Sequence, residues 1–200
     1  MKILIIGANG TIGKKVAQAL SSKHEIITAG RTSGDIQMDI TSAQSIEAGF
    51  KQMGSLDACI CTAGTGYYGK LDTMTEENVY SGIRNKLMGQ INVVLIGQHY
   101  LNDNGSITLT SGILSEEPVR NSSCVAMLNG GINSFVLAAS LELTRGIRIN
   151  VVSPGLVEDS VERYGASFPG IDPVPMNKVV NAYIRSTEGA ITGKILKVYA

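Results

Sequence analysis

Three glycines near the start of the chain constrain its fold more than any other feature of the sequence. Gly7, Gly10 and Gly13 are spaced every third residue and directly follow an apolar run at residues 3–6. A segment with helical periodicity, residues 14–22, comes next. Glycine suits a tight turn of this kind because it accepts unusual backbone angles and has no Cβ atom. The order of strand, glycine turn and helix predicts a βα unit that binds a diphosphate at the helix N-terminus, with an unliganded βα turn as the alternative.

The composition sets the class of protein. The 200 residues suit a single domain, residues 1–200, with a sizeable core. The 17 basic and 17 acidic side chains balance, so no overall field attracts nucleic acid or an anionic membrane. No apolar stretch approaches a membrane span, and the first apolar run is too short for a signal peptide. We therefore expect a cytoplasmic protein whose ligands are small molecules.

The cysteines are expected to be free thiols. Cys59 and Cys61 lie two residues apart in an apolar run, so they share one face of a strand and cannot easily bridge, and Cys124 stands alone. Three thiols without framework spacing indicate a reducing compartment. The sequence also lacks the ligand spacing of a metal site, and we predict none.

Short apolar strands alternate with helical segments along the whole chain. This alternation predicts an α/β fold: a Rossmann-type, doubly wound parallel sheet of about seven strands with helices on both faces, in three layers. The expected strands are residues 3–6, 25–29, 36–38, 56–62, 106–109, 145–152 and 194–199. The expected helices are residues 14–22, 42–53, 76–100, 123–143 and 177–186. Residues 164–175, rich in proline, glycine and aromatic side chains, are expected to cover a site.

The end of the second strand indicates which dinucleotide binds. An acidic residue there would accept hydrogen bonds from the 2′-hydroxyl of an adenosine ribose. The sequence has Arg31 instead, with Thr32 and Ser33 beside it. Guanidinium and hydroxyl groups donate to a phosphate, so NADP(H) is the predicted cofactor. The alternative is that Arg31 is a solvated turn residue.

Taken together, the motifs resemble those of the short-chain dehydrogenase/reductase superfamily over the whole chain. Residues 7–13, Gly-Ala-Asn-Gly-Thr-Ile-Gly, resemble the glycine turn of its divergent members, and residues 62–64, Thr-Ala-Gly, resemble its Asn-Ala-Gly. Residues 148–155 resemble its strand-six signature, and residues 191–193 its Thr-Gly before the last strand. The resemblance and the Arg31 argument together imply these cofactor-binding residues: Gly7, Asn9, Gly10, Thr11, Ile12, Gly13, Arg31, Thr32, Asp39, Ile40, Ala63, Gly64, Pro154 and Gly155.

The resemblance also implies catalytic residues, and here the sequence departs from the family. Ser111 follows the fifth strand as the family's substrate-orienting serine does, and Asn85 occupies the place of the asparagine that carries a proton-relay water. The family's tyrosine general acid and the lysine four residues later fall at Cys124 and Leu128. No Tyr-x-x-x-Lys occurs anywhere in the sequence.

Several side chains remain as substitutes for the missing tyrosine. Cys124 can donate a proton in principle, although a small buried residue that fills the helix face is the simpler interpretation. The other candidates, each with the alternative of forming a pocket wall, are Tyr67, Tyr68 and Tyr164. Lys86 is expected to point to another face of its helix than Asn85. The residues expected to bind or orient at most, or to lie exposed, are Ser122, Asn129, Glu158 and Asp159.

These features leave more than one function open. The retained Ser111 and Asn85 favour an NADP(H)-dependent oxidoreductase acting on a small carbonyl or alcohol. The missing tyrosine and lysine favour a catalytically silent NADP(H)-binding redox sensor or regulatory module, and nothing favours an isomerase or dehydratase on the same fold. We adopt the oxidoreductase as the predicted function. In many relatives the helices that carry Asn85 and Cys124 pair between subunits, so the resemblance also implies a homodimer or higher homo-oligomer.

Overall fold

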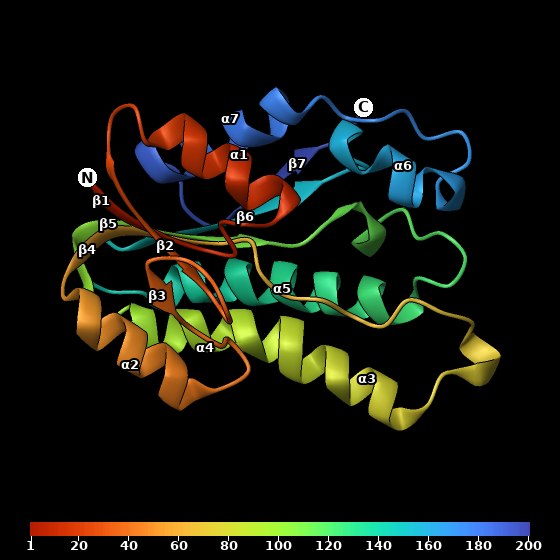
Figure 1. Cartoon of the computed structure of the whole chain (residues 1–200), viewed down its shortest axis with the longest axis horizontal. Coiled ribbons are helices and arrows are strands. Elements are labelled where there is room, and N and C mark those ends of the chain that lie inside the picture. The colour runs from red at the N-terminus through yellow and green to blue at the C-terminus, as the bar shows by residue number, and fades with distance from the viewer.

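A computed structural model describes all 200 residues and shows a parallel sheet between two layers of helices (Figure 1). The sheet has 7 strands in the order β3-β2-β1-β4-β5-β6-β7. Every neighbouring pair is parallel, which confirms the predicted fold class. The strands are β1 (Lys2–Ile6), β2 (Glu25–Gly30), β3 (Ile36–Gln37), β4 (Leu56–Cys61), β5 (Leu101–Thr110), β6 (Arg148–Pro154) and β7 (Lys194–Val198).

Helices cover both faces of this sheet (Figure 1). One face carries α1 (Thr11–Leu20) and α7 (Met176–Glu188), which pack against each other. The opposite face carries α2 (Ala43–Met53), α4 (Met88–Gly97) and α5 (Ser123–Glu142). The remaining helices are α3 (Glu76–Gly82), which continues into α4, and the single turn α6 (Val161–Tyr164).

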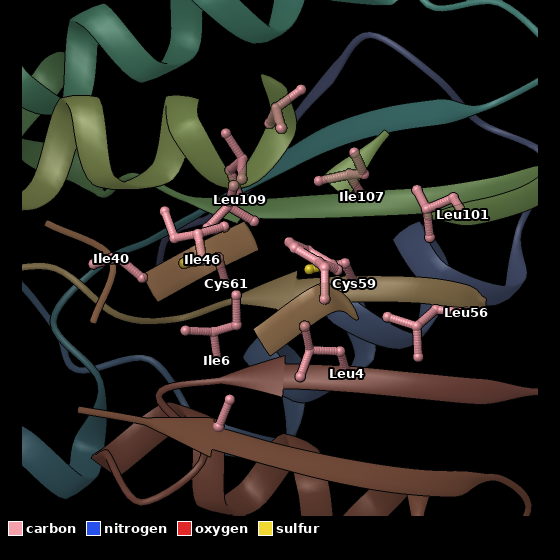
Figure 2. Packing of buried hydrophobic residues seen from close by; sticks show 14 of the residues in the cluster. Leu4, Ile6, Ile40, Ile46, Leu56, Cys59, Cys61, Leu101, Ile107 and Leu109 are labelled. Carbon is pink, nitrogen blue, oxygen red and sulfur yellow. The ribbon is translucent and has the colours of Figure 1, made fainter. Parts of the chain in front are cut away.

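The two faces have separate hydrophobic cores, because successive side chains of a strand point to opposite faces. Ile3 and Ile5 of β1 pack with α1 and α7, whereas Leu4 and Ile6 pack with α2, α4 and α5. Figure 2 shows Leu4, Ile6, Cys59 and Cys61 in the second cluster. Both cysteines are completely buried and free, as predicted from their spacing.

The strand order reverses between β1 and β4, and this reversal positions the site. β2 and β3 lie on one side of β1, and β4 to β7 lie on the other. The chain therefore leaves the carboxyl ends of β1 and β4 in opposite directions and opens a crevice there, where ligands bind in open α/β sheets. The glycine turn follows β1, and Thr62-Ala63-Gly64 follows β4.

Two strand boundaries, the starts of β5 and β6, differ from the sequence-based prediction by three residues or more. Residues 102–105 precede the predicted strand 106–109, but they belong to β5, where the pairing with β4 shifts register and Asn104 has a φ of 63°. β6 begins at Arg148 rather than Arg145, because Arg145 and Gly146 have φ values of 57° and 70° and form a turn. Polar turn residues can thus lie within a strand as a bulge.

The single helix predicted over residues 76–100 is interrupted. After α3, residues Ile83–Leu87 form a π-helical turn, η2, before α4 begins at Met88. A π-helical turn holds an extra residue relative to an α-helix and often occurs at functional sites. Asn85 and Lys86 lie inside it.

α5 corrects the expectation that no stretch approaches a membrane span. Its most apolar window has a mean hydropathy of 1.5, and by length and composition alone the helix could cross a membrane. This is weak evidence, because core helices of water-soluble proteins pass the same test. Here α5 packs against β5 and β6, and its buried Ile132 and Val136 belong to the core that it shares with α2 and α4.

Candidate active site at the carboxyl ends of the strands

The glycine turn is packed so closely against β4 that two of its positions exclude a side chain. Gly7 has a φ of +86°, and a Cβ atom built on Gly13 would lie 2.2 Å from the carbonyl oxygen of Gly7. Thr62 stabilises this turn, because its hydroxyl lies 3.1 Å from the carbonyl oxygens of both Ile6 and Gly7. The threonine that replaces the family's asparagine therefore ties the turn to the end of β4.

A cavity of about 290 Å³ lies over the glycine turn, and we call it the glycine-turn cavity. Its wall brings together eight of the predicted cofactor-binding residues: Gly7, Asn9, Gly10, Arg31, Asp39, Ile40, Ala63 and Gly64. The amide of Asn9 donates to the Ser33 hydroxyl at 2.7 Å, which links the turn to the loop after β2. Thr11, Gly13 and Thr32 do not line this cavity.

The charges in this cavity suit an anionic group near Arg31. The Asp39 carboxylate accepts hydrogen bonds from the backbone and hydroxyl of Thr41, which hold the pKa of Asp39 below its ordinary value. The positive charge of Arg31 lowers that pKa further. Arg31 itself is exposed and forms no ion pair with any carboxylate. Its guanidinium is therefore free to bind a phosphate.

A second cavity of about 340 Å³, the Ser111 cavity, lies beside the first one. It is bounded by the ends of β5 and β6, one face of α5, and the covering segment that holds Tyr164 and Phe168. Four predicted cofactor-binding residues line it: Ile12, Gly64, Pro154 and Gly155. The two cavities share Gly64 and Thr65, so they are neighbouring parts of one crevice.

Ser111 is held in this cavity by a buried hydrogen-bond network. The side chain of Gln90, completely buried, donates to the carbonyl oxygen of Thr110 at 2.9 Å and accepts from its N–H at 2.8 Å. The backbone N–H of Ser111 donates to Val152 at 2.9 Å. Its own hydroxyl is buried without a partner, and so is the amide oxygen of Asn129. Buried polar atoms are normally paired, so these two are candidates to bind a ligand.

Asn85 lies on the other side of the crevice from Ser111. Its side-chain oxygen accepts a hydrogen bond from the backbone N–H of Thr65 at 2.8 Å, and the residue lines the glycine-turn cavity. It does not line the Ser111 cavity. In this structure Asn85 anchors the loop after β4.

Cys124 does not line the Ser111 cavity either, which corrects its prediction as a proton donor. It is 3% exposed, and a Cβ atom added to Gly82 of α3 would lie 3.2 Å from its sulfur. Leu128 is completely buried, and the same added Cβ atom would lie 2.8 Å from its Cδ1 atom. Both side chains are therefore packed under α3, as expected of small residues that fill a helix face.

The remaining candidates separate into two groups. Tyr68 and Tyr164 line the Ser111 cavity, whereas the ring of Tyr67 lies against Gly69. Glu158 accepts a hydrogen bond from the backbone N–H of Met176 at 2.9 Å and so caps α7, while Asp159 lies 3.9 Å from Lys15. The two acids thus have structural partners outside the cavity.

Sequence reasoning missed Lys86. It does point to another face than Asn85, as expected, but that direction leads into the Ser111 cavity. Its Nζ atom donates to the carbonyl oxygen of Ser111 at 3.4 Å. Burial lowers the pKa of Lys86 to about 8. Lys86 lies inside the π-helical turn, which the periodicity of the sequence does not reveal.

Comparisons with known proteins identify the family of the chain. Residues 2–180 match the family model described as enoyl-(acyl carrier protein) reductase. An uncharacterized oxidoreductase of Methylorubrum extorquens is 26% identical, over 77% of this chain and 72% of its own. The mouse 3-oxoacyl-[acyl-carrier-protein] reductase is 23% identical, over 80% and 77%.

Solved structures extend the similarity to the whole chain. The crystal structure of the protein lin1944 from Listeria innocua has 45% sequence identity and a TM-score of 0.98, with 100% of both chains covered. A small-chain dehydrogenase in complex with NADPH has 27% identity and a TM-score of 0.89, and covers 100% of this chain and 96% of its own. With its parallel sheet, glycine turn and family match, the chain belongs to the short-chain dehydrogenase/reductase superfamily of oxidoreductases.

Proposed function

We propose that the protein is an NADP(H)-dependent oxidoreductase that interconverts a small carbonyl compound and its alcohol. The observation that carries this proposal is the crevice itself, in which the glycine-turn cavity and the Ser111 cavity meet at Gly64 and Thr65. A dinucleotide bound in this crevice would meet the glycine turn in the glycine-turn cavity and the unpaired Ser111 hydroxyl in the Ser111 cavity.

The residues present fit NADP(H). The glycine turn leaves space for a diphosphate because Gly7 and Gly13 exclude side chains, and Arg31 is free to bind the 2′-phosphate. Pro154 and Gly155 would hold the nicotinamide beside Ser111. A relative with 27% identity was solved with NADPH. When bound, the cofactor supplies the hydride for a carbonyl carbon and is oxidised.

Exchange of Arg31 for aspartate tests the choice of cofactor. We expect Arg31→Asp to raise the Kd for NADPH by about 10- to 100-fold, because charge-assisted hydrogen bonds worth about 1.5–3 kcal/mol are replaced by repulsion. Binding of NADH should be unchanged or tighter. Fluorescence titration with both cofactors measures this, with the exposed Lys23→Asp as the control for charge. An equal loss for both cofactors would contradict a 2′-phosphate site.

Turnover tests the reaction. The wild-type protein should oxidise NADPH with at least one member of a panel of small aldehydes and ketones, and Ser111→Ala should lower the rate. Tight NADPH binding without turnover would reject the oxidoreductase in favour of a silent redox sensor.

We also propose that α4 and α5 pair with a second copy of the chain. Both helices expose apolar side chains, namely Met88, Leu95, Met127, Leu137 and Leu141. Small residues on α5, among them Gly130 and Ala138, permit close approach of another helix.

The double variant Leu137→Glu/Leu141→Glu should be monomeric at concentrations where the wild type sediments as a dimer, because four carboxylates would be buried in each interface. Sedimentation velocity measures this. Leu71→Glu is the control, since Leu71 is exposed on a different segment. A monomeric wild type would contradict the proposal.

A further inference from the structure

The Ser111 cavity contains one charged side chain, and it is not one that the family motif supplies. Of the residues that line the cavity, only Lys86 carries a charge at neutral pH. No aspartate, glutamate, arginine or histidine is part of the lining. We propose, on the basis of the function proposed above, that Lys86 is the catalytic residue that protonates the substrate oxygen in place of the missing tyrosine.

The loop after β4 packs against the stem of Lys86. Gly64 has a φ of +120°, and a Cβ atom on it would lie 3.0 Å from both the Cα and Cγ atoms of Lys86. The loop after β4 therefore crosses directly over this lysine. The neighbouring Asn85 fixes the same loop through its hydrogen bond to Thr65. A residue constrained in this way is preorganised for a catalytic role.

The amino group of Lys86 has capacity left for a ligand. Its hydrogen bond to Ser111 is long, at 3.4 Å, and two of its three donors remain free. The Ser111 hydroxyl is unpaired in the same cavity. A single carbonyl oxygen can accept from both groups. This arrangement suits an oxygen on which negative charge develops during the reaction.

The surroundings of Lys86 set its proton affinity. The titratable groups that face it are the Cys61 thiol on β4 and the phenols of Tyr68 and Tyr164 from the covering loops. Burial raises the pKa of Cys61 to about 12, so this thiol is neutral near pH 8. Burial without a carboxylate partner lowers the pKa of Lys86 to about 8, which brings it into the range suited to a general acid.

In the chemical step the transferred proton is held at Nζ of Lys86. Bound NADPH would supply the hydride by giving up a C–H bond and becoming NADP⁺. A new C–H bond would then form at the carbonyl carbon, and the electron pair of the C=O π bond would move to the oxygen. That oxygen takes a proton from Nζ of Lys86, whose ammonium becomes an amine. The amine then regains a proton from water. Ser111 donates a hydrogen bond to the same oxygen and orients it.

Kinetics with matched variants test this role. With NADPH and the panel of small aldehydes and ketones, Lys86→Met should lower kcat by about 100-fold or more, the usual contribution of a general acid. Its Kd for NADPH should change less than about twofold. The exposed Lys178→Met should behave as wild type.

The pH profile separates proton donation from a charge effect. Because the acid must be protonated, the wild-type reduction rate should fall as the pH rises through about 8. Lys86→Arg keeps the positive charge but cannot release its proton, so its lower rate should not show this fall. A fall that persists unchanged in Lys86→Arg would overturn the assignment.

A measurement on the wild-type protein without cofactor gives an independent readout. Lysine amines are labelled with acetic anhydride over a range of pH, and the labelling of Lys86 is followed by mass spectrometry. We expect its reactivity to rise through a midpoint near pH 8. No inflection between about pH 7 and 9 would overturn the proposal.

The outcomes distinguish the two proposals. If Lys86→Met retains wild-type turnover, the proposal that Lys86 is the proton donor is overturned, and the proposal that the protein is an oxidoreductase stands. A large rise in the Kd for NADPH with unchanged kcat makes Lys86 a cofactor ligand and also overturns the proposal. Wild-type protein that binds NADPH but turns over no carbonyl on the panel overturns both.

Discussion

Replacement of Gly13 by alanine is expected to destabilise the protein by about 2 kcal/mol or more and to abolish NADPH binding. Alanine is the better helix former by about 1 kcal/mol, and Gly13 lies in the first turn of α1. Packing outweighs this gain, because the new methyl group would lie 2.2 Å from the Gly7 carbonyl and 2.6 Å from the Thr62 hydroxyl. The turn would have to open.

Urea unfolding and NADPH titration measure the two effects of Gly13→Ala. Gln18→Ala on the exposed face of the same helix is the control, and it should change stability by less than about 0.5 kcal/mol. Gly10→Ala should have an intermediate effect, since its Cβ atom would lie 3.3 Å from the Gly7 carbonyl. A Gly13→Ala protein with wild-type stability and affinity would show that the turn is not packed as described.

The second large effect concerns the positions where the family has tyrosine and lysine. The double variant Cys124→Tyr/Leu128→Lys restores the family motif, but we expect it to lose at least about 3 kcal/mol of stability and to gain no activity. α3 packs directly on these positions, with Gly82 against both side chains, and Gly66 of the loop after β4 lies against Leu128. No space remains there for a phenol ring, and a lysine at 128 would be buried without a partner.

The same two measurements, urea unfolding and NADPH-dependent turnover, check this expectation. Cys124→Ala/Leu128→Met is the matched control because it changes both positions without adding bulk or charge, and it should stay close to wild type. If the motif-restoring variant is stable and more active, then Cys124 and Leu128 lie closer to the substrate than the structure places them.

The predictions that succeeded from the sequence rest on local patterns. Short apolar runs between helical segments identified the strands, and the spacing of Cys59 and Cys61 placed both on one face of a strand, where the structure buries them in one cluster. The glycine turn could be recognised because its steric requirement is local: a tight turn at the end of a strand needs glycine regardless of the rest of the fold.

The predictions that failed depend on contacts between distant segments. The single helix predicted over residues 76–100 is interrupted by a π-helical turn, and Asn85 and Lys86 inside that turn line different cavities. Cys124 was considered as an acid because the family spacing selects it, whereas Gly82 of α3 allows it to pack away from the cavity. Neither the turn nor that packing leaves a periodic signal.

The sequence by itself determined the parallel α/β fold and the glycine turn, because hydrophobic periodicity and glycine geometry act over a few residues. Its Arg31 also pointed to a 2′-phosphate, a prediction that cofactor titration can test. Only the tertiary structure decided which polar groups share the Ser111 cavity, because residues from the loops after β4 and β5, from the end of β6 and from the helices meet there. It brought Lys86 to Ser111, 25 positions apart in the sequence, and turned Cys124 away. The charged group in the pocket thus depends on how the segments pack.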